Sequence, residues 1–293
     1  MKHQETGLTC SNRGILHDLP TVGVRCGVTI LTQKQIVMID TLKLCENGHA
    51  IVLDRVEVYD ASMLNCYAFR RGTDYIDGKS LALGNMVSGF PFKLNGIHYY
   101  NSESAYIAGM FSDGSLEHMN LQMELAKETN GFMAKKRIRR QNRHLARKDW
   151  EEFNIDWMLY VVWSKVKGNE EFKKILMDLP DDSVIIEDST FQAGRTSSIW
   201  GTKNKEQRKF TNDYKRKLKE EGLSKKAIKD KCDEKRLGEW RKTGVFEGKN
   251  LMGKILMLCR EALKKGGIPP IDFDLLKSKN IHLLGKKLTF EIY

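Results

Sequence analysis

The sequence lacks the features that mark several common classes of protein. It has no apolar run of the roughly 18 residues that a membrane span needs, and its start, MKHQETGLTC, lacks the apolar segment of a signal peptide. No Walker or dinucleotide-binding fingerprint is present, so we expect no bound cofactor. The seven histidines show no metal-ligand spacing, and no Cys-x-x-Cys pair occurs among Cys10, Cys26, Cys45, Cys66, Cys232 and Cys259. We therefore expect no metal site and a reducing, cytoplasmic setting.

The composition is that of a folded, basic protein. Of the 293 residues, 41% are hydrophobic, which is enough for a normal core and excludes global disorder. The formal net charge is +11. Such an excess favours polyanionic partners such as nucleic acid or phosphorylated ligands, although an ordinary basic protein has the same signature.

The first 68 residues are rich in β-branched side chains, in runs at 22–32, 35–44 and 50–60. The pair Asn47-Gly48 stands between the second and third runs, and both residue types tolerate the positive φ of a hairpin turn. The pattern predicts a small antiparallel sheet in an N-terminal extension, 1–68.

Helical periodicity begins after this section. Ser102 and Ser115 are expected to cap two helices, and Asp149 is expected to start the most apolar one, which stops at Gly168. The segment 183–187, SVIIE, is predicted to be a buried strand.

A strongly basic segment follows. Residues 203–249 contain 17 Lys or Arg and 9 Asp or Glu, which is +8 of the total charge. We expect two basic helices that project from the core. An amphipathic helix is predicted at 250–267 and a final strand at 287–293.

Five sequence blocks, in this order, resemble the NADAR family of NAD- and ADP-ribose-associated N-glycosidases. They are GNMVSGFPFKLNGIHYYNSESAYIAGMF at 84–111, MAKKRIRR at 133–140, ARKDWEEFNIDWM at 146–158, IWG at 199–201 and GKNLMGKILMLCR at 248–260. The resemblance implies an α+β fold with a mainly helical core at 69–264. The basic insertion at 203–247 and the β-rich extension would be additions to this core, and 265–293 a tail packed on it.

The resemblance also implies cleavage of an N-glycosidic bond, with Glu103 at the position of the proposed catalytic carboxylate. Such cleavage develops positive charge on the ribose and requires a water molecule, and a carboxylate can stabilise the cation and activate the water. At the first turn of a helix, the helix dipole favours the ionised form of Glu103. From spacing alone, an ordinary capping Glu is the alternative.

A second block supplies cations. Eight lysines and arginines, without an acid, lie between 135 and 148. Lys135 occupies the lysine position of the family's Ala-Lys block and is the second catalytic candidate; it could also form a Schiff base with an opened ribose. Five further residues are expected to contact phosphate or nucleic acid: Lys136, Arg137, Arg139, Arg140 and Arg143. The alternative is that these side chains form a solvated basic face.

The remaining family positions are expected to bind the ligand. They are Asn85, Ser102, Arg147, Asp149, Trp150, Trp200, Gly201 and Asn250. We expect the pocket among the starts of the helices at Glu103, Asp149 and Asn250, with Trp200 stacking on a base. Trp150 could equally be a residue of the hydrophobic core, and Asn250 could equally be the cap of the last helix. Gly248 and Gly253 are expected to allow close backbone approach.

Four functions are compatible with these patterns. We favour removal of ADP-ribose from a modified nucleobase, preferably guanine, in DNA or RNA, with ADP-ribose as the product. Such an activity would serve DNA repair or the reversal of toxin-type modification, in a virus or a toxin–antitoxin locus. A hydrolase of small N-ribosylated metabolites, such as riboflavin-pathway intermediates, would not need the basic segment. A non-catalytic ADP-ribose reader remains open because Ser104 and Ser197 depart from the family's His and acidic residue. A nucleic-acid-binding protein that works through its basic segment is the fourth possibility.

Overall fold

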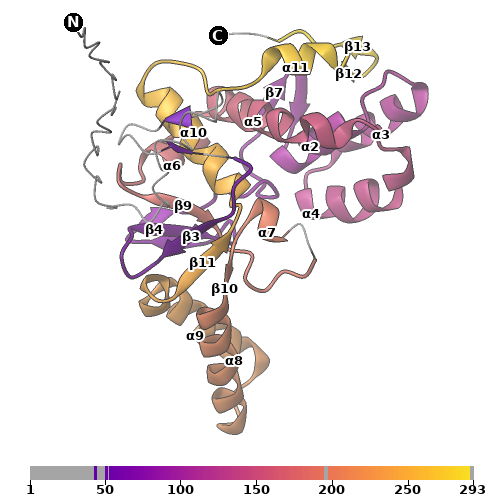
Figure 1. Ribbon diagram of the computed structural model, residues 1–293. Coiled ribbons are helices and arrows are strands. Elements are labelled where there is room, and N and C mark those ends of the chain that lie inside the picture. Colours follow the sequence, from indigo (N-terminus) through magenta and orange to yellow (C-terminus); the bar gives the residue numbers. More distant parts are fainter. Residues whose placement is uncertain (1–42, 45–49, 52, 195–196, 291–293) are drawn as a thin grey trace, which may run out of the picture.

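The computed structural model describes residues 43–44, 50–51, 53–194 and 197–290, and it confirms the expected α+β class. In Figure 1, strands β3, β4, β9 and β11 lie between a group of helices and a projecting helical arm. The predicted run at 22–32 lies outside the described residues. In the described part of the chain the helices are α2 (Ser102–Met110), α3 (Leu116–Lys127), α4 (Gly131–Met133), α5 (Trp150–Gly168), α6 (Glu170–Met177), α7 (Ser197–Trp200), α8 (Lys205–Glu220), α9 (Lys225–Leu237), α10 (Leu251–Lys264) and α11 (Phe273–Ser278), with the π-helical turn η1 (Ala134–Arg139) and the 3₁₀ turns η2 (Arg143–Leu145) and η3 (Glu239–Lys242).

The strands from the N-terminal section are part of the core. β4 (Cys66–Phe69) pairs in parallel with β9 (Val184–Glu187). β3 (Glu57–Asp60) pairs antiparallel with β11 (Val245–Gly248), which also pairs with β10 (Lys203–Asn204). The expectation of a separate antiparallel sheet is therefore wrong for β3 and β4. All four residues of β4 are buried, as in parallel strands that are covered on both faces.

Short hairpins make up the other strand pairs among the described residues. β1 (Lys43–Leu44) pairs antiparallel with β2 (Ala50–Ile51), as expected on either side of Asn47-Gly48, which itself lies outside the described residues. β5 (Tyr75–Ile76) pairs with β6 (Lys79–Ser80), β7 (Phe92–Leu94) with β8 (Ile97–Tyr99), and β12 (His282–Leu283) with β13 (Lys286–Lys287).

The core centres on α5, which packs against α2, α10 and β7. Trp157 of α5 is fully buried, and its indole N–H donates to the Tyr106 carbonyl at 3.1 Å. A Cβ on Gly109 would lie 2.2 Å from the Trp157 Nε1 atom. A glycine is therefore needed on α2 where the indole crosses it.

The helix caps differ in part from the prediction. Ser115 caps α3 as expected, accepting from the His118 N–H at 3.3 Å. The cap of α2 is Asn101, whose side chain accepts from the Ser104 N–H at 2.8 Å, and Ser102 is the first helical residue. Because an amide oxygen caps as well as a hydroxyl, Asn101 and Ser102 could not be separated by residue type.

Helices α8 and α9 form a basic arm, 205–237, that extends away from the rest of the molecule (Figure 1), as expected. Leu218, Ile228 and Cys232 form a small apolar cluster between the two helices. The buried ion pair of Arg236 with Asp74, at 2.8 Å, joins α9 to the core.

The predicted final strand is wrong over residues 288–290. Leu288 is buried and donates its N–H to the Ile281 carbonyl at 2.7 Å, and Phe290 packs on Tyr160 and Phe273. The alternation in this tail reflects packing onto α5 and α11 rather than a strand. None of the described helices is both long and apolar enough to cross a membrane.

Candidate active site

A cavity of about 540 Å³ lies where α2, η1, α7 and the end of β9 meet. The segment after β4 and the loop at 84–88 complete its walls. Five of the residues expected to act in catalysis or binding line it: Asn85, Glu103, Lys135, Arg139 and Trp200. These five come from three different sequence blocks, which the fold brings together.

Glu103 lies in the first turn of α2 and is only 5% exposed. Its N–H donates to the Asn85 carbonyl at 3.1 Å, which joins α2 to the cavity loop. Burial raises the pKa of Glu103, and the positive charges of Lys135 and Arg139 oppose this rise. Desolvation therefore outweighs the two cations in shifting the pKa, which is opposite to the shift expected from the helix terminus alone.

Glu187, the last residue of β9, provides a second carboxyl to the cavity. Its N–H donates to the Asn250 side chain at 3.0 Å, and its carbonyl accepts from the Thr202 N–H at 2.9 Å. Desolvation raises its pKa to about 7; the charge of Glu103 also raises it, whereas that of Lys135 lowers it. Glu187 was not among the site residues expected from the sequence. An acidic residue at the end of an otherwise apolar buried strand was the available signal.

Lys135 and Arg139 lie four residues apart in the π-helical turn η1 and both line the cavity. Arg139 Nη1 is 3.9 Å from Glu103 Oε1, and its guanidinium lies 5.8 Å from the centre of the Tyr106 ring. Lys136, Arg137 and Arg140 are exposed and do not line the cavity. Arg143, in η2, is also exposed. The basic block thus has two cations in the cavity, whereas Lys136, Arg137, Arg140 and Arg143 face solvent.

Asn85 has a buried acceptor that nothing in the described residues satisfies. Its amide nitrogen lies 3.4 Å from the Met158 sulfur, and its Oδ1 has no hydrogen-bond partner. An unsatisfied buried acceptor in a cavity wall costs stability unless a ligand donor pairs with it. A ribose hydroxyl or a base amine is a suitable donor.

Aromatic rings form another wall. Trp200 and Tyr106 line the cavity and pack edge to face, with centroids 5.4 Å apart. Trp150 lies behind Tyr106, at 5.0 Å, and is buried away from the cavity. Trp200 is therefore positioned to stack on a ligand, and Trp150 supports the wall.

Gly201 and Asn250 lie behind the cavity and position Glu187. A Cβ on Gly201 would be 2.7 Å from the Glu187 carbonyl oxygen. Asn250 has a left-handed backbone (φ 51°) and makes no capping bond with α10; its amide instead donates to the Ile185 carbonyl at 2.9 Å. A Cβ on Gly248 or Gly253 would lie within 2.5 Å of a backbone oxygen, which confirms the expected close approach.

Ser102, Arg147 and Asp149 lie outside the cavity lining. Arg147 and Asp149 form a two-bonded ion pair, with both distances 2.9 Å. The same guanidinium donates to the carbonyls of Ser112 and Lys279, so it holds α2 and the C-terminal segment together. The expectation that the starts of α5 and α10 border the pocket is wrong, because these polar side chains are bonded within the protein.

The chemistry available in this cavity is that of two interacting carboxyls beside two cations and an aromatic wall. Carboxyls with raised pKa values can share the roles of general acid and general base near neutral pH. Across the described ranges, no three His, Cys, Asp or Glu side chains are grouped to hold a metal ion.

No protein-family model and no curated protein matches the chain. Among solved structures the chain is similar to the E. coli protein YbiA, determined by NMR. The sequence identity is 20%, the match covers 70% of this chain and 88% of YbiA, and the TM-score is 0.41.

Proposed function

We propose that the protein is an N-glycosidase that removes ADP-ribose from a modified nucleobase, most specifically guanine in DNA. The observation that carries the proposal is the cavity in which Glu103 and Glu187, two carboxyls with raised pKa values, lie with Lys135 and Arg139. The sequence blocks that resemble the NADAR family supply these positions except Glu187. Ser197, which stands where that pattern has an acid, also lines the cavity.

In the proposed reaction the two carboxyls have complementary roles. The pKa of Glu187 is about 7, so a large fraction is protonated at neutral pH and can give its proton to the departing base nitrogen. Glu103, as the carboxylate, accepts a proton from water while the water oxygen bonds to the anomeric carbon. The carbon–nitrogen bond breaks with its electron pair on the base. The products are free ADP-ribose and the restored base.

The other cavity groups bind the substrate in this proposal. Lys135 and Arg139 suit the diphosphate of ADP-ribose, because charge-assisted bonds to phosphate oxygens are strong. Arg139 also opposes the rise in the pKa of Glu103. Trp200 suits stacking against the adenine or the leaving base, and the free Asn85 oxygen accepts a hydroxyl or amine proton.

A short oligonucleotide with ADP-ribose on guanine tests the proposal. Wild type, Glu103→Gln and Glu117→Gln would be incubated with it and the products weighed by mass spectrometry. Glu117 is the matched control, since it is an acidic residue in the first turn of α3 but is exposed. We expect wild type and Glu117→Gln to remove the ADP-ribose mass, and Glu103→Gln to bind but cleave at least tenfold more slowly, a loss of about 1.4 kcal/mol or more.

Three outcomes would contradict the proposal. Full activity of Glu103→Gln would remove Glu103 from the mechanism. A retained complex without cleavage by any variant would identify a non-catalytic reader. Absence of both binding and cleavage would favour small N-ribosylated metabolites as the substrates.

A further inference from the structure

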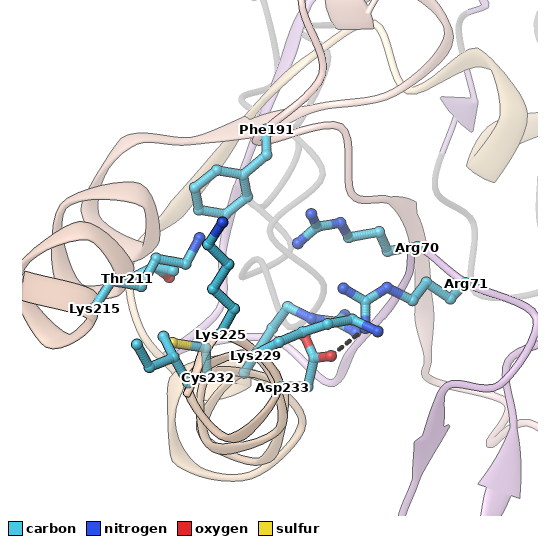
Figure 2. Close-up of a pocket in the computed structure, with 11 residues that line it drawn as sticks. Arg70, Arg71, Phe191, Thr211, Lys215, Lys225, Lys229, Cys232 and Asp233 are labelled. Atoms are coloured by element: carbon cyan, nitrogen blue, oxygen red, sulfur yellow. Dashed lines mark hydrogen bonds and ion pairs between the residues drawn. The ribbon is translucent and has the colours of Figure 1, made fainter. Parts of the chain in front are cut away.

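A second cavity, of about 250 Å³, lies between the basic arm and the core. Figure 2 shows the side chains that point into it: Lys215 from α8, Lys225 and Lys229 from α9, and Arg70 and Arg71 from the opposite side, beneath the ring of Phe191. We call this space the arm cavity. None of these residues was named as a site residue from the sequence, although Lys215, Lys225 and Lys229 lie in the basic segment 203–249.

The arm cavity has a large excess of positive charge. Its lining includes the cations Arg70, Arg71, Lys215, Lys225, Lys229 and Arg236, and one carboxylate, Asp233. Asp233 is already paired with Arg71. Arg236 is paired with the buried Asp74, and its Nε atom has no partner among the described residues.

Four of these cations have no counter-ion in the part of the chain that the structure describes: Arg70, Lys215, Lys225 and Lys229. Arg70 and Lys215 instead lie over the Phe191 ring, with distances of 4.9 Å and 5.1 Å to its centroid. Desolvation lowers the pKa of Arg70, as do the nearby charges of Arg236 and Arg71, whereas the charges of Asp188 and Asp233 oppose this change. An anion in this space would reduce the repulsion that remains among the cations of the arm cavity.

The arm cavity adjoins the candidate active site. Arg70 and Arg71 line both cavities. Phe191 faces the arm cavity, and the next residue, Gln192, lines the active-site cavity. The two arginines are therefore next to both cavities.

We propose that the arm cavity is a phosphate subsite that binds a backbone phosphate of the nucleic-acid strand next to the modified base. This assignment rests on the proposed function. Within the active-site cavity, Lys135 and Arg139 are available for the diphosphate of ADP-ribose. The cations of the arm cavity are therefore left for the backbone phosphates of the nucleic-acid strand.

Binding of a short, unmodified, fluorescently labelled single-stranded oligonucleotide tests the subsite without any turnover. Fluorescence anisotropy at several salt concentrations would compare wild type with Lys215→Gln/Lys229→Gln. The matched control is Lys219→Gln/Lys226→Gln, which makes the same charge change on the same two helices at exposed positions outside the cavity. Thermal melting of the three proteins would show that the arm remains folded.

We expect the cavity variant to raise Kd about tenfold or more and the control by less than about threefold. The slope of log Kd against log salt should also fall by about 0.7 in the cavity variant, because one single-strand phosphate contact contributes about that much. If both double variants weakened oligonucleotide binding equally, the subsite would be overturned. The binding would then come from diffuse electrostatic attraction of the oligonucleotide to the arm. Failure of wild type to bind the strand would overturn it outright.

A parallel titration with free ADP-ribose separates the two sources of phosphate. The proposal expects ADP-ribose to bind wild type and the cavity variant equally. Weaker ADP-ribose binding by the cavity variant, with unchanged strand binding, would assign the arm cavity to the diphosphate instead. Because these readouts are equilibrium constants, absence of cleavage would overturn the proposed function without deciding the subsite.

Discussion

The Arg139 guanidinium lies 3.9 Å from the Glu103 carboxylate, whereas the adjacent cations Lys136, Arg137 and Arg140 are exposed. The π-helical turn η1 gives this arrangement, since residues about four apart share one face of such a turn. Lys135 and Arg139 thereby both line the cavity, and Arg139 is the one paired with Glu103. The expected effect of Arg139 is on the protonation of Glu103.

Replacement of Arg139 by Gln is expected to shift the pH dependence of catalysis. Loss of the nearby positive charge raises the pKa of Glu103 further, so the carboxylate form is reached only at higher pH. The acidic limb of the kcat/KM profile should move to higher pH. Arg140→Gln, at an exposed neighbouring position, is the control. Equal shifts in the two variants would contradict a local effect.

Glu187→Gln is expected to abolish the alkaline limb of the same profile. If protonated Glu187 is the general acid, wild-type activity should decline as pH rises through about 7, where this group loses its proton. The amide cannot donate a transferable proton, so the variant should be slower by about 10²-fold or more at pH 6 and nearly independent of pH above it. A variant that keeps the wild-type alkaline limb would assign that limb to another group.

Asn250→Gly should impair both stability and turnover. Glycine adopts the left-handed backbone of this position easily but loses the two bonds to β9. We expect a loss of about 1–3 kcal/mol in the free energy of unfolding. A decrease in kcat is also expected, because Glu187 is no longer held. Asn280→Gly, at another left-handed but exposed asparagine, is the control and should change little.

Lys165 predicts a pH-dependent stability that is independent of the active site. Its ammonium is fully buried, has no hydrogen-bond partner among the described residues, and lies 3.9 Å from the Phe172 ring centroid. Burial lowers its pKa to about 7, so between pH 7 and about 10.5 the unfolded chain binds more protons than the folded one. The contribution of Lys165 to folding stability therefore improves as pH rises through this window and is worst below pH 7.

Lys165→Met should remove this effect. We expect the variant to be more stable than wild type at pH 7 by about 1–4 kcal/mol, with the difference shrinking toward pH 10. Denaturant unfolding across this pH range measures it. A variant that is less stable at neutral pH would indicate that the packing of the lysine stem and its contact with Phe172 outweigh the buried charge.

Local signals predicted much of the helical framework. Ser115 is a clear cap, and the apolar side chains of α5 and α10 recur at helical spacing before Gly168 and the glycines after Lys264. Glu103, Lys135 and Trp200 could be singled out because they stand in sequence blocks with a recognisable order.

Local signals could not predict which strands pair when they are far apart in the sequence. Phe69 lies beside Glu187 because β4 and β9 pair in parallel, across more than a hundred residues of intervening helices. This pairing brings Arg70 and Glu187 to the cavity, and no local pattern at either strand indicates the other. Arg147 and Asp149 were predicted to bind the ligand because their residue types are suited to it. In the structure they instead form an ion pair with each other, which only the geometry shows.

The two ends of the basic arm enter the core on adjacent strands. Asn204 of β10 is the direct cross-strand partner of Phe246 of β11, so the whole helical arm occupies the position of a hairpin loop. Loops of that kind can be lengthened, shortened or exchanged without a change in the register of the strands that carry them. Under the proposed function, the arm that would contact the strand can therefore change in length while Glu103 and Glu187, which lie outside it, keep their places in the cavity.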